Sequence, residues 1–576
     1  MNVERLKTDI LILGAGGAGL FAALHAQKAN PDLDITIVSK GLLGKCGCTR
    51  MVQGGYNVAL NPGDSVERHF MDTIEGGKWL PHQELAWTLV TKAIERVQEL
   101  ENEIGCFFDR NPDGTLHGKA FAGQTFDRTV HKGDLTGIEI INRLMEQVWA
   151  RPIRRLEEHR AVALIPSKDG ALSGVLLIDV RSGAFRFVAA QAVLVATGGG
   201  PTMYRYHTPS GDKSMDGLAM ALRLGLPLRD MEMVQFHPTG LLAGPDTRMT
   251  GTVLEEGLRG AGGHLLNGAM HRFMGDYDPK LERATRDVVS RAIYAEMRAG
   301  RTTPHGGVYI KMGHLGPAKV AKEFKGMVDR CRDCGFDLAG GLVEVVPTAH
   351  YFMGGVVCDV DTATERFGLF VAGEDASGMH GANRLGGNGV ANSTVFGGIA
   401  GDVMPRWIAA NPGHREPDIS VLDAELARAQ EPFAQKPGDL NVLREKLLDC
   451  MWDEVGVVRD RASIERGLAA LDRIEAELLA TGVADADRRF NLTWHDWLNL
   501  RSLTEISRVI ALAALKRENS RGAHFRSDFP EPGDFATSTF TVARQAAGGI
   551  EIGEQPVQFT HVKPGETLLR DALAAE

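Results

Sequence analysis

The chain has 576 residues, and because domains usually run to roughly 100–200 residues, we expect two to four of them rather than one core. Hydrophobic residues make up 43% of the chain and charged residues 24%, a composition typical of globular proteins. The net charge of −10 gives no support for a nucleic-acid partner, so an anionic substrate needs a local cluster of positive charge.

Cysteine number and hydropathy indicate the cellular compartment in which the protein works. The seven cysteines are odd in number and scattered, which fits a reducing compartment better than a disulfide framework, so we expect a cytoplasmic protein. Glycines interrupt the apolar start, Met1 to Leu20, which therefore predicts a buried strand and turn rather than a signal peptide. No stretch reaches the roughly 18 apolar residues that span a bilayer. We expect a soluble protein without a transmembrane segment, and docking at the inner face of a membrane stays open.

The first predicted elements form a dinucleotide-binding unit. Residues 9–13 are mostly apolar and predict a buried parallel strand. The run Gly14-Ala15-Gly16-Gly17-Ala18-Gly19 follows directly, then a predicted helix over 20–28 and a second strand over 35–38. A lone GxGxxG motif is weak evidence, but a strand, a turn, a helix and a second strand around it make a dinucleotide site the expected interpretation.

Each motif glycine has its own reason. Gly14 permits the tight turn, Gly16 lets the backbone approach a pyrophosphate, and Gly19 allows the helix to pack closely on the strand. The helix N-terminus then offers free N–H groups and partial positive charge to the phosphates.

The end of the second strand disfavours NAD as the bound nucleotide and leaves FAD open. The second strand ends in Ser39-Lys40, where NAD-binding proteins place an acidic residue for the adenosine ribose. Further strands end in glycines at Val193–Gly200 and in a carboxylate at Leu369–Glu374. Glu374 is suited to accept a hydrogen bond from a ribityl hydroxyl.

From here the sequence resembles one family, the flavoprotein subunits of succinate dehydrogenase and fumarate reductase together with L-aspartate oxidase. The matching segments occur in the family's order along nearly the whole chain. They are Ser39-Lys40, Gln53-Gly54-Gly55, Asp216-Gly217, Gln235–Thr239, Glu256–Gly260, Arg286–Val289, Pro347–Tyr351, His380–Asn388 and Ser520–His524.

The resemblance implies an α/β fold. A Rossmann-like FAD-binding domain, 1–240 and 351–415, would be split by a capping domain, 241–350, and followed by a C-terminal helical domain and tail, 416–576. Apolar residues at spacings of three and four support helices over 464–479 and 503–516. After Pro530 we expect an irregular tail with a short strand over 557–559.

The resemblance also implies the site residues. The cofactor would be held by Gly14, Gly16, Gly19, Ser39, Lys40, Gln53, Gly54, Gly55, Asp216, Glu374 and Asn388. His237, His350 and Arg384 would clamp the substrate carboxylates, since a guanidinium binds a carboxylate with two parallel hydrogen bonds. Arg286 would donate the proton. Arginine is a poor acid, so Arg286 needs a relay, which Glu256 and Arg259 would supply from one side of a helix.

One departure from the family concerns the flavin linkage. Covalent members attach FAD through a histidine five residues before the Gln-Gly-Gly element, and here that position is Cys48. No histidine lies between Ser39 and Gly55. A thioether from Cys48 is an alternative, but a free cysteine more often behaves as a small apolar residue. We therefore expect non-covalent FAD, which by analogy with the family favours substrate reduction.

A second departure concerns the substrate. The family places a threonine, which binds a substrate carboxylate, directly before the relay glutamate, and here that position is Glu255. A carboxylate repels another carboxylate at close range. Either Glu255 turns away, or the substrate carries a different group at that end, such as an amine or amide, which is the expectation we favour.

Cys331 and Cys334 form an isolated CxxC, expected to lie on one helix of the capping region. No second pair accompanies them, so we expect no metal site. The chain lacks ferredoxin-like cysteine spacing, so any iron–sulfur relay must come from another subunit.

The leading interpretation is an FAD-dependent oxidoreductase of the fumarate reductase and succinate dehydrogenase type. It would transfer hydride between flavin N5 and the C=C or CH–CH bond of a small carboxylate substrate. The alternatives are an amino-acid oxidase resembling L-aspartate oxidase, a flavoprotein subunit of a membrane-docked iron–sulfur complex, and a non-catalytic FAD-binding protein.

Overall fold

The computed structural model describes residues 3–245 and 247–569. Its largest sheet has the order β6-β2-β1-β9-β8-β7, and β16 also pairs with β9. Strands β6, β2, β1, β9 and β16 run parallel, whereas β7, β8 and β9 form an antiparallel meander. The bounds are β1 Glu4–Leu13, β2 Ile35–Ser39, β6 Arg154–Glu157, β7 His159–Pro166, β8 Leu172–Asp179, β9 Phe185–Val195 and β16 Leu369–Val371.

The predicted opening of the chain is confirmed. Strand β1 leads through the glycine turn into α1, Gly17–Ala29, and then into β2. Helix α1 packs against α10, Asn388–Ala410. A Cβ on Gly397 would lie 2.5 Å from the Ala18 carbonyl oxygen, so glycine is what lets the two helices approach. In this way a helix near residue 400 is fixed against the glycine turn.

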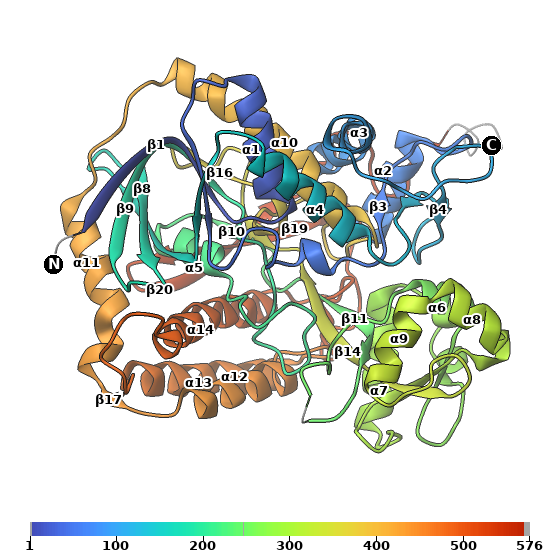
Figure 1. Cartoon of the computed structure of the whole chain (residues 1–576). Coiled ribbons are helices and arrows are strands. Elements are labelled where there is room, and N and C mark those ends of the chain that lie inside the picture. The colour runs from blue at the N-terminus through green and yellow to red at the C-terminus, as the bar shows by residue number, and fades with distance from the viewer. Residues whose placement is uncertain (1–2, 246, 570–576) are drawn as a thin grey trace.

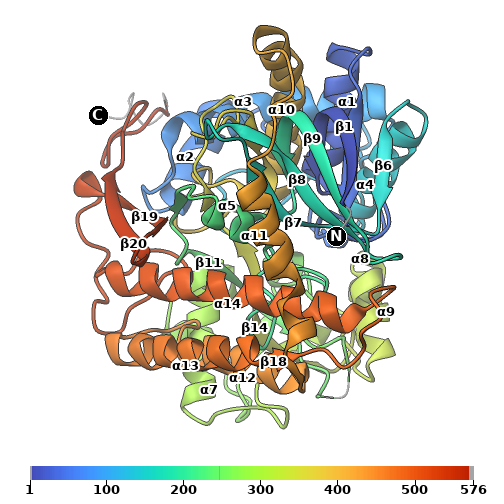
Figure 2. The same cartoon turned by 90° about the vertical axis from the view of Figure 1, so that its left-hand side faces the viewer.

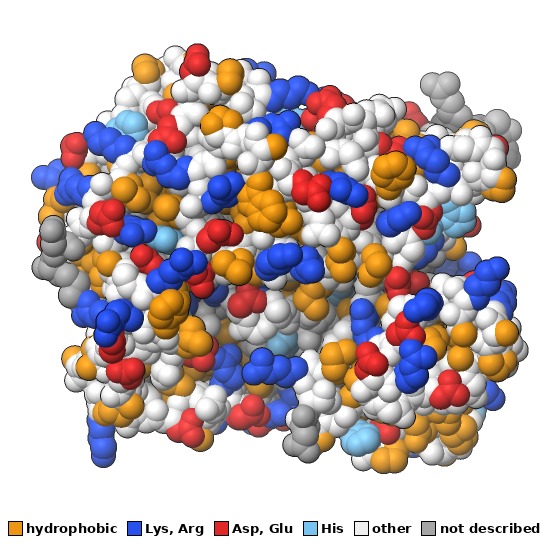
Figure 3. Space-filling view, viewed as in Figure 1, with side chains coloured by type: hydrophobic (Ala, Val, Ile, Leu, Met, Phe, Trp, Pro, Cys, Tyr) orange, Lys and Arg blue, Asp and Glu red, His pale blue; other side chains and the backbone are white. Residues whose placement is uncertain are grey.

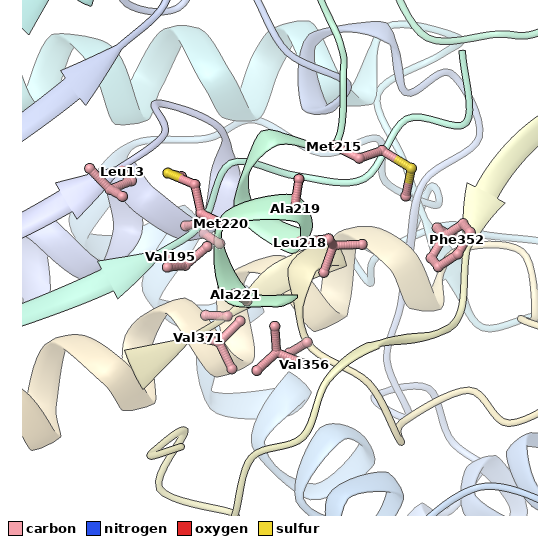
Figure 4. Close-up of a cluster of buried hydrophobic side chains, with 14 of the residues drawn as sticks. Leu13, Val195, Met215, Leu218, Ala219, Met220, Ala221, Phe352, Val356 and Val371 are labelled. Carbon is pink, nitrogen blue, oxygen red and sulfur yellow. The ribbon is translucent and has the colours of Figure 1, made fainter. Parts of the chain in front are cut away.

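The carboxyl ends of three parallel strands converge on one small helix. Leu13 of β1, Val195 of β9 and Val371 of β16 belong to one buried cluster with α5, Asp216–Arg223, and Figure 4 shows Met220 and Ala221 of that helix beside them. All of these side chains are buried. Because ligands bind outside the carboxyl ends of parallel strands, this cluster fixes the floor of a site.

Other helices and a small sheet complete this part of the molecule. They are α2 Val66–Gly76, α3 Gln83–Glu99 and α4 Thr136–Trp149, with the three-stranded sheet β3 Tyr56–Asn57, β5 Thr129–Val130 and β4 Gly118–Lys119.

A capping domain with its own hydrophobic core lies at the lower right in Figure 1, below α2, α3 and α4. Its sheet has the order β11-β14-β13-β12, with bounds Val234–Leu241, Leu342–Phe352, Val308–Lys311 and His264–Leu266. Its helices are α6 Gly257–Gly260, α7 Arg286–Arg298, α8 Pro317–Glu323 and α9 Lys325–Asp333. Strands β11 and β14 carry the chain into and out of the cap, which matches the predicted insertion, while the boundaries 241 and 350 stay predictions.

The C-terminal part is helical, as predicted. Its elements are α11 Ile419–Gln430, α12 Leu440–Asp453, α13 Arg461–Leu479 and α14 Leu492–Lys516, with the short pair β17 Lys436–Pro437 and β18 Thr481–Gly482. Helices α12, α13 and α14 lie side by side in Figures 1 and 2. Both predicted helices are confirmed, although α14 begins eleven residues earlier than predicted, at Leu492 rather than residue 503.

The prediction for the tail was wrong. Residues 557–559 form no strand; instead β19, Thr539–Ala546, and β20, Gly549–Pro556, form a hairpin. This hairpin joins β10, Leu228–Arg229, and β15, Gly355–Val356, in a four-stranded sheet. The alternation of Thr539-Phe540-Thr541-Val542 and the Gly548-Gly549 turn are ordinary hairpin signals. The tail therefore returns to the FAD-binding part of the chain.

No helix in residues 3–245 and 247–569 combines the length and the apolar character that crossing a membrane requires. Figure 3 shows basic and acidic side chains interspersed over one face, which is hollowed where the capping domain meets the rest of the molecule.

Candidate active site

A cavity of about 570 Å³ lies between the carboxyl ends of the parallel strands and the capping domain. Its lining contains most of the residues that the sequence singled out. The predicted cofactor residues in its wall are Gly14, Gly16, Ser39, Lys40, Gln53, Gly54, Gly55, Asp216 and Glu374, and the predicted substrate and catalytic residues are His237, Glu255, Glu256, Arg286, His350 and Arg384.

The glycine turn has no room for side chains. Gly14 has φ +115°, and a Cβ there would lie 2.0 Å from the Ala196 carbonyl oxygen. A Cβ on Gly19 would lie 2.0 Å from the Gly14 carbonyl oxygen. The N-cap residue of α1, Gly16, has no side chain, and Thr49 Oγ1 accepts from the Gly17 N–H. The positive end of α1 thus faces the cavity, as a pyrophosphate requires.

A buried ion network lies at the end of β2. Lys40 Nζ donates to Asp216 Oδ2 at 3.1 Å, and Arg160 donates to Asp216 Oδ1 at 2.7 Å. Burial opposes ionisation of Asp216, but Arg160 and Lys40 outweigh it and hold its pKa below the ordinary value. The network is tied to α14, because Asn499 Oδ1 accepts from both Lys40 and Arg160.

Acceptors that suit the hydroxyl and amide groups of FAD line the middle of the cavity. Burial raises the pKa of Glu374 to about 7, and its Oε1 accepts from the Phe352 N–H at 2.9 Å. Gln53 donates to the Val253 carbonyl, which leaves its buried Oε1 without a hydrogen-bond partner. A buried orphan acceptor beside a glycine cradle fits a bound FAD.

Three predicted residues do not line the cavity. Gly19 acts through helix packing and Arg259 lies behind Glu256. Asn388 is fully buried, and its side chain bonds Asn57, His69 and Thr73. Asn388 therefore braces the start of α10 and does not reach the cavity with its side chain.

Arg286 belongs to a continuous hydrogen-bonded chain. Its Nε and Nη2 both donate to Glu256 Oε2, at 2.9 and 2.6 Å, and its Nη1 donates to Gln235 Oε1 at 3.0 Å. Arg259 donates to the other carboxylate oxygen, Glu256 Oε1, at 3.2 Å. Burial opposes ionisation of Glu256, but Arg286 and Arg259 outweigh it, so the pKa of Glu256 lies below its ordinary value. The predicted spatial relation of Glu256 and Arg259 is therefore present.

Two neutral imidazoles stand beside this chain. Burial and then the charge of Arg286 lower the pKa of His237, while burial and then Arg384 lower that of His350. Their ring centroids are 5.4 Å apart. The Thr239 N–H donates to His237 Nδ1 at 3.3 Å, which leaves the proton of the neutral ring on Nε2. His350 Nδ1 shares a hydrogen bond of 2.9 Å with Thr208 Oγ1.

Arg384 lies in the cavity wall beside this chain and is available to an anion. Its guanidinium lies 4.4 Å from the Tyr351 ring centroid, and its Nε has no hydrogen-bond partner. Burial and then Arg286 lower the pKa of Arg384 to about 10, which still leaves it charged at neutral pH. Within residues 3–245 and 247–569 it makes no ion pair, so an incoming carboxylate finds it unpaired.

Glu255 has different neighbours from Glu256. It is 3% exposed and lies 3.6 Å from Lys119 Nζ, measured to Oε2. Burial raises its pKa. Glu255 therefore takes no part in the hydrogen-bonded chain of Arg286, but its side chain still lines the cavity.

The cysteines singled out in the sequence lie in two separate places. Cys48 lines the cavity, and burial raises the pKa of its thiol to about 12, so the thiol is protonated at neutral pH. Cys331 lies in α9 and Cys334 is its C-cap. In the part of the chain that the structure describes, no three His, Cys, Asp or Glu side chains are placed to hold a metal ion.

Several residues of the site were missed. Gln235 connects Arg286 to Asn383 and to the Arg384 carbonyl. Asp134 and Arg330 line the cavity near Glu255, and Lys119 pairs with it. Only Gln235 lay in a segment already singled out; the others meet across the domain boundary, and no local pattern announces them.

Comparisons with known proteins agree with this geometry. A family model described as an FAD binding domain matches residues 9–390, and one described as the fumarate reductase flavoprotein C-terminus matches 444–568. One subunit of the CoM/CoB fumarate reductase of Methanothermobacter marburgensis is 39% identical over 92% of this chain and 96% of its own length.

Solved structures show the same fold along the whole chain. A quinol fumarate reductase chain of Escherichia coli has a TM-score of 0.92 at 32% identity, covering 98% of this chain and 99% of its own. Sdh1 of Mycobacterium smegmatis has a TM-score of 0.87 at 35% identity, covering 98% of this chain and 96% of its own. Together with the family models, these similarities show that the chain belongs to the fumarate reductase and succinate dehydrogenase family of FAD-dependent flavoprotein oxidoreductases.

Proposed function

We propose that the protein interconverts the C=C and CH–CH forms of a small carboxylate of the fumarate and succinate type, with reduction as the favoured direction. Bound FAD would supply or accept the hydride at N5, which is the part of the chemistry that the protein does not provide. The observation that carries the proposal is the chain Arg259–Glu256–Arg286, which ends in the cavity beside an unpaired Arg384.

The protein's first task is to move a proton. In reduction, one alkene carbon receives the hydride and its neighbour receives a proton from Arg286. Arg286 regains the proton through Glu256 and Arg259, whose hydrogen bonds form an unbroken route. Because Glu256 is held ionised between two guanidinium groups, it can accept and pass on a proton without leaving its place.

The second task is to hold the substrate. Arg384 offers a planar pair of donors to one carboxylate, and His237 adds the Nε2–H of a neutral ring, with neutral His350 beside it. These groups withdraw electron density from the conjugated double bond, which makes it a better hydride acceptor.

Replacing Arg384 with methionine is expected to raise KM for the carboxylate substrate about 100-fold, since one charge-assisted bidentate contact is lost. Flavin content is expected to stay normal, and steady-state kinetics of acceptor reduction would measure the change. Arg415→Met is the matched control, because Arg415 also covers an aromatic ring, that of Phe367, but lies outside the cavity. An unchanged KM in Arg384→Met would contradict the assigned clamp.

We propose that FAD is bound without a covalent link. Cys48 occupies the position of the family's linking histidine, and its protonated thiol is a poor nucleophile. Acid precipitation of the purified protein is expected to release all flavin to the supernatant, and Cys48→Ser is expected to keep a normal flavin content. Flavin fluorescence that stays with the denatured polypeptide would show the thioether instead.

The relatives are named as subunits, and we propose that this chain likewise passes electrons to or from a partner protein, an iron–sulfur subunit docked at the inner membrane face being the expected one. Co-purification of the native protein tests this. An amino-acid oxidase is the second candidate, and hydrogen peroxide formed from aspartate and oxygen would favour it.

The test of the central proposal is anaerobic photoreduction of the holoprotein followed by reoxidation with α,β-unsaturated carboxylates. Recovery of the oxidised flavin spectrum within seconds is expected with at least one of them. If every such acceptor leaves the flavin reduced for as long as a buffer blank does, the proposed chemistry is wrong.

A further inference from the structure

The two neighbouring glutamates of the cavity wall lie in different electrostatic surroundings. The charges that act on Glu256 are those of Arg286, Arg259 and Arg384. The charges that act on Glu255 are those of Lys119, Asp134 and Arg330. The cavity therefore has one wall rich in cations and a second wall in which charges of both signs alternate.

The cations of the second wall, Lys119 and Arg330, already have partners within the protein. Lys119 Nζ donates to the Gly133 carbonyl at 2.7 Å and lies 3.6 Å from Glu255. Arg330 Nη1 donates to the Val253 carbonyl at 3.1 Å. Since two cations face two carboxylates, Glu255 and Asp134, the wall has no net charge with which to neutralise a second carboxylate of a substrate.

What the second wall does offer is acceptors. Glu255 Oε2 and Asp134 Oδ2 are buried oxygens without a hydrogen-bond partner, and both residues line the cavity. Glu255 is only 3% exposed, and its nearest cation, Lys119 Nζ, lies 3.6 Å from Oε2, beyond ordinary hydrogen-bond length. An unsatisfied buried acceptor is costly, and a ligand that brings an N–H donor removes that cost.

A substrate carboxylate placed here would meet the opposite situation. It would bring only acceptor oxygens and a negative charge toward Glu255, and like charges in a buried site repel strongly. An ammonium group would donate hydrogen bonds, but its positive charge would stay uncompensated, because the two cations and two carboxylates of this wall already balance each other. A neutral amide donates two hydrogens and carries no charge.

We propose that the Glu255 wall binds a primary amide, so that the substrate is the half-amide of a fumarate-like diacid rather than the diacid itself. This inference rests on the proposed function, because Arg384 still holds the single carboxylate and Arg286 still donates the proton. The amide carbonyl is conjugated with the double bond, so the alkene stays activated toward hydride.

The reaction balances with the same parts. The double bond takes up a hydride, carrying two electrons from reduced FAD, and a proton from Arg286, so that the saturated half-amide and oxidised FAD are formed. The C–N bond of the amide stays intact throughout.

The experiment compares fumarate with fumaramate, its half-amide, as oxidants of the photoreduced holoprotein in anaerobic stopped flow. The half-amide is expected to have a kcat/KM at least about tenfold higher. Glu255→Thr is expected to reverse the preference, because the variant removes the repelling charge and adds a hydroxyl donor. Glu255→Gln, which keeps the size of the side chain, is expected to weaken the preference. Glu323→Thr is the matched control, because Glu323 is an exposed residue of the capping domain. It is expected to leave the ratio of the two kcat/KM values unchanged.

A binding measurement separates recognition from chemistry. Calorimetric titration of oxidised holoprotein with the saturated half-amide and with succinate is expected to show the same order of affinity, reversed in Glu255→Thr.

The outcomes that oppose the inference differ from those that oppose the function. Faster reoxidation of the wild type by fumarate than by fumaramate overturns the amide assignment and leaves the proposed reaction intact. A preference for fumarate that grows as pH falls also overturns the amide assignment. Such a result would show that Glu255, which faces Lys119, Asp134 and Arg330, becomes protonated and donates a hydrogen bond to a substrate carboxylate. Silence of both acceptors while another α,β-unsaturated carboxylate reoxidises the flavin overturns the amide assignment alone. Silence of all such acceptors in the wild type and in Glu323→Thr, with flavin bound, overturns the proposed function itself.

Discussion

Substitution of Arg286 by glutamine is expected to reduce kcat for acceptor reduction about a thousandfold, while FAD remains bound and spectrally normal. The physical reason is that glutamine keeps hydrogen-bonding capacity toward Glu256 and Gln235 but has no acidic proton to deliver. General acid catalysis typically contributes about 10²–10⁴ in rate. Stopped-flow reoxidation at saturating acceptor, with flavin absorbance as the signal, measures the effect directly.

Two comparisons make this result interpretable. Arg298→Gln lies on the same helix, α7, but is exposed, and it is expected to leave kcat unchanged. Oxidation of the reduced flavin can be followed separately with a one-electron dye, which takes up electrons without hydride or proton transfer from Arg286, and Arg286→Gln is expected to reduce it normally. Substantial fumarate-type turnover in Arg286→Gln would show that another group donates the proton.

Substitution of Gly19 by alanine is expected to yield protein that is largely free of FAD. The added Cβ would lie 2.0 Å from the Gly14 carbonyl oxygen, a backbone atom. Gly14 cannot retreat, because its own space is closed by the Ala196 carbonyl. Helix α1 must therefore shift away from the turn, and forced overpacking of this kind typically costs about 1–3 kcal/mol in the folded state.

The measurement is the ratio of flavin to protein after purification, followed by titration of FAD into the apoprotein. An affinity at least tenfold weaker than that of the wild type is expected. Gly548→Ala serves as the control, because that glycine lies in the β19–β20 turn with no atom within 4 Å of the added carbon. Normal FAD content in Gly19→Ala would contradict the packing role assigned to the third motif glycine.

The nucleotide end of the site was predictable because its information is local. A strand, a glycine turn and a helix within the first thirty residues specify one another by spacing, and the structure places them as expected. Arg286 and Glu256 are 30 residues apart and meet only through the cap fold, so their pairing came from the family resemblance. The β19–β20 hairpin carried a local signal as well, and interpreting that segment as an irregular tail was an avoidable error.

The second wall of the cavity could not be foreseen. Lys119 belongs to β4 of the FAD-binding part, whereas Glu255 lies in the cap, and the pair forms only where two separately folded units touch. Neither the period of hydrophobic residues nor a motif reports which charged side chains will face each other across such a boundary. The sequence did show that Glu255, an acidic residue, stands at a position where the family has a hydroxyl-bearing residue.

The ties between Lys40 and α14 bear on how the protein acquires its cofactor in the cell. Lys40 and Asn499 are separated by 459 residues, so at about 5–20 residues per second a ribosome needs roughly 20–90 s to synthesise the chain between them. During that interval the nascent glycine turn exists without the helix that braces its ion network. We therefore expect productive loading of FAD to be a late event, after α14 has emerged and docked, on nearly complete chains rather than on the emerging N-terminus.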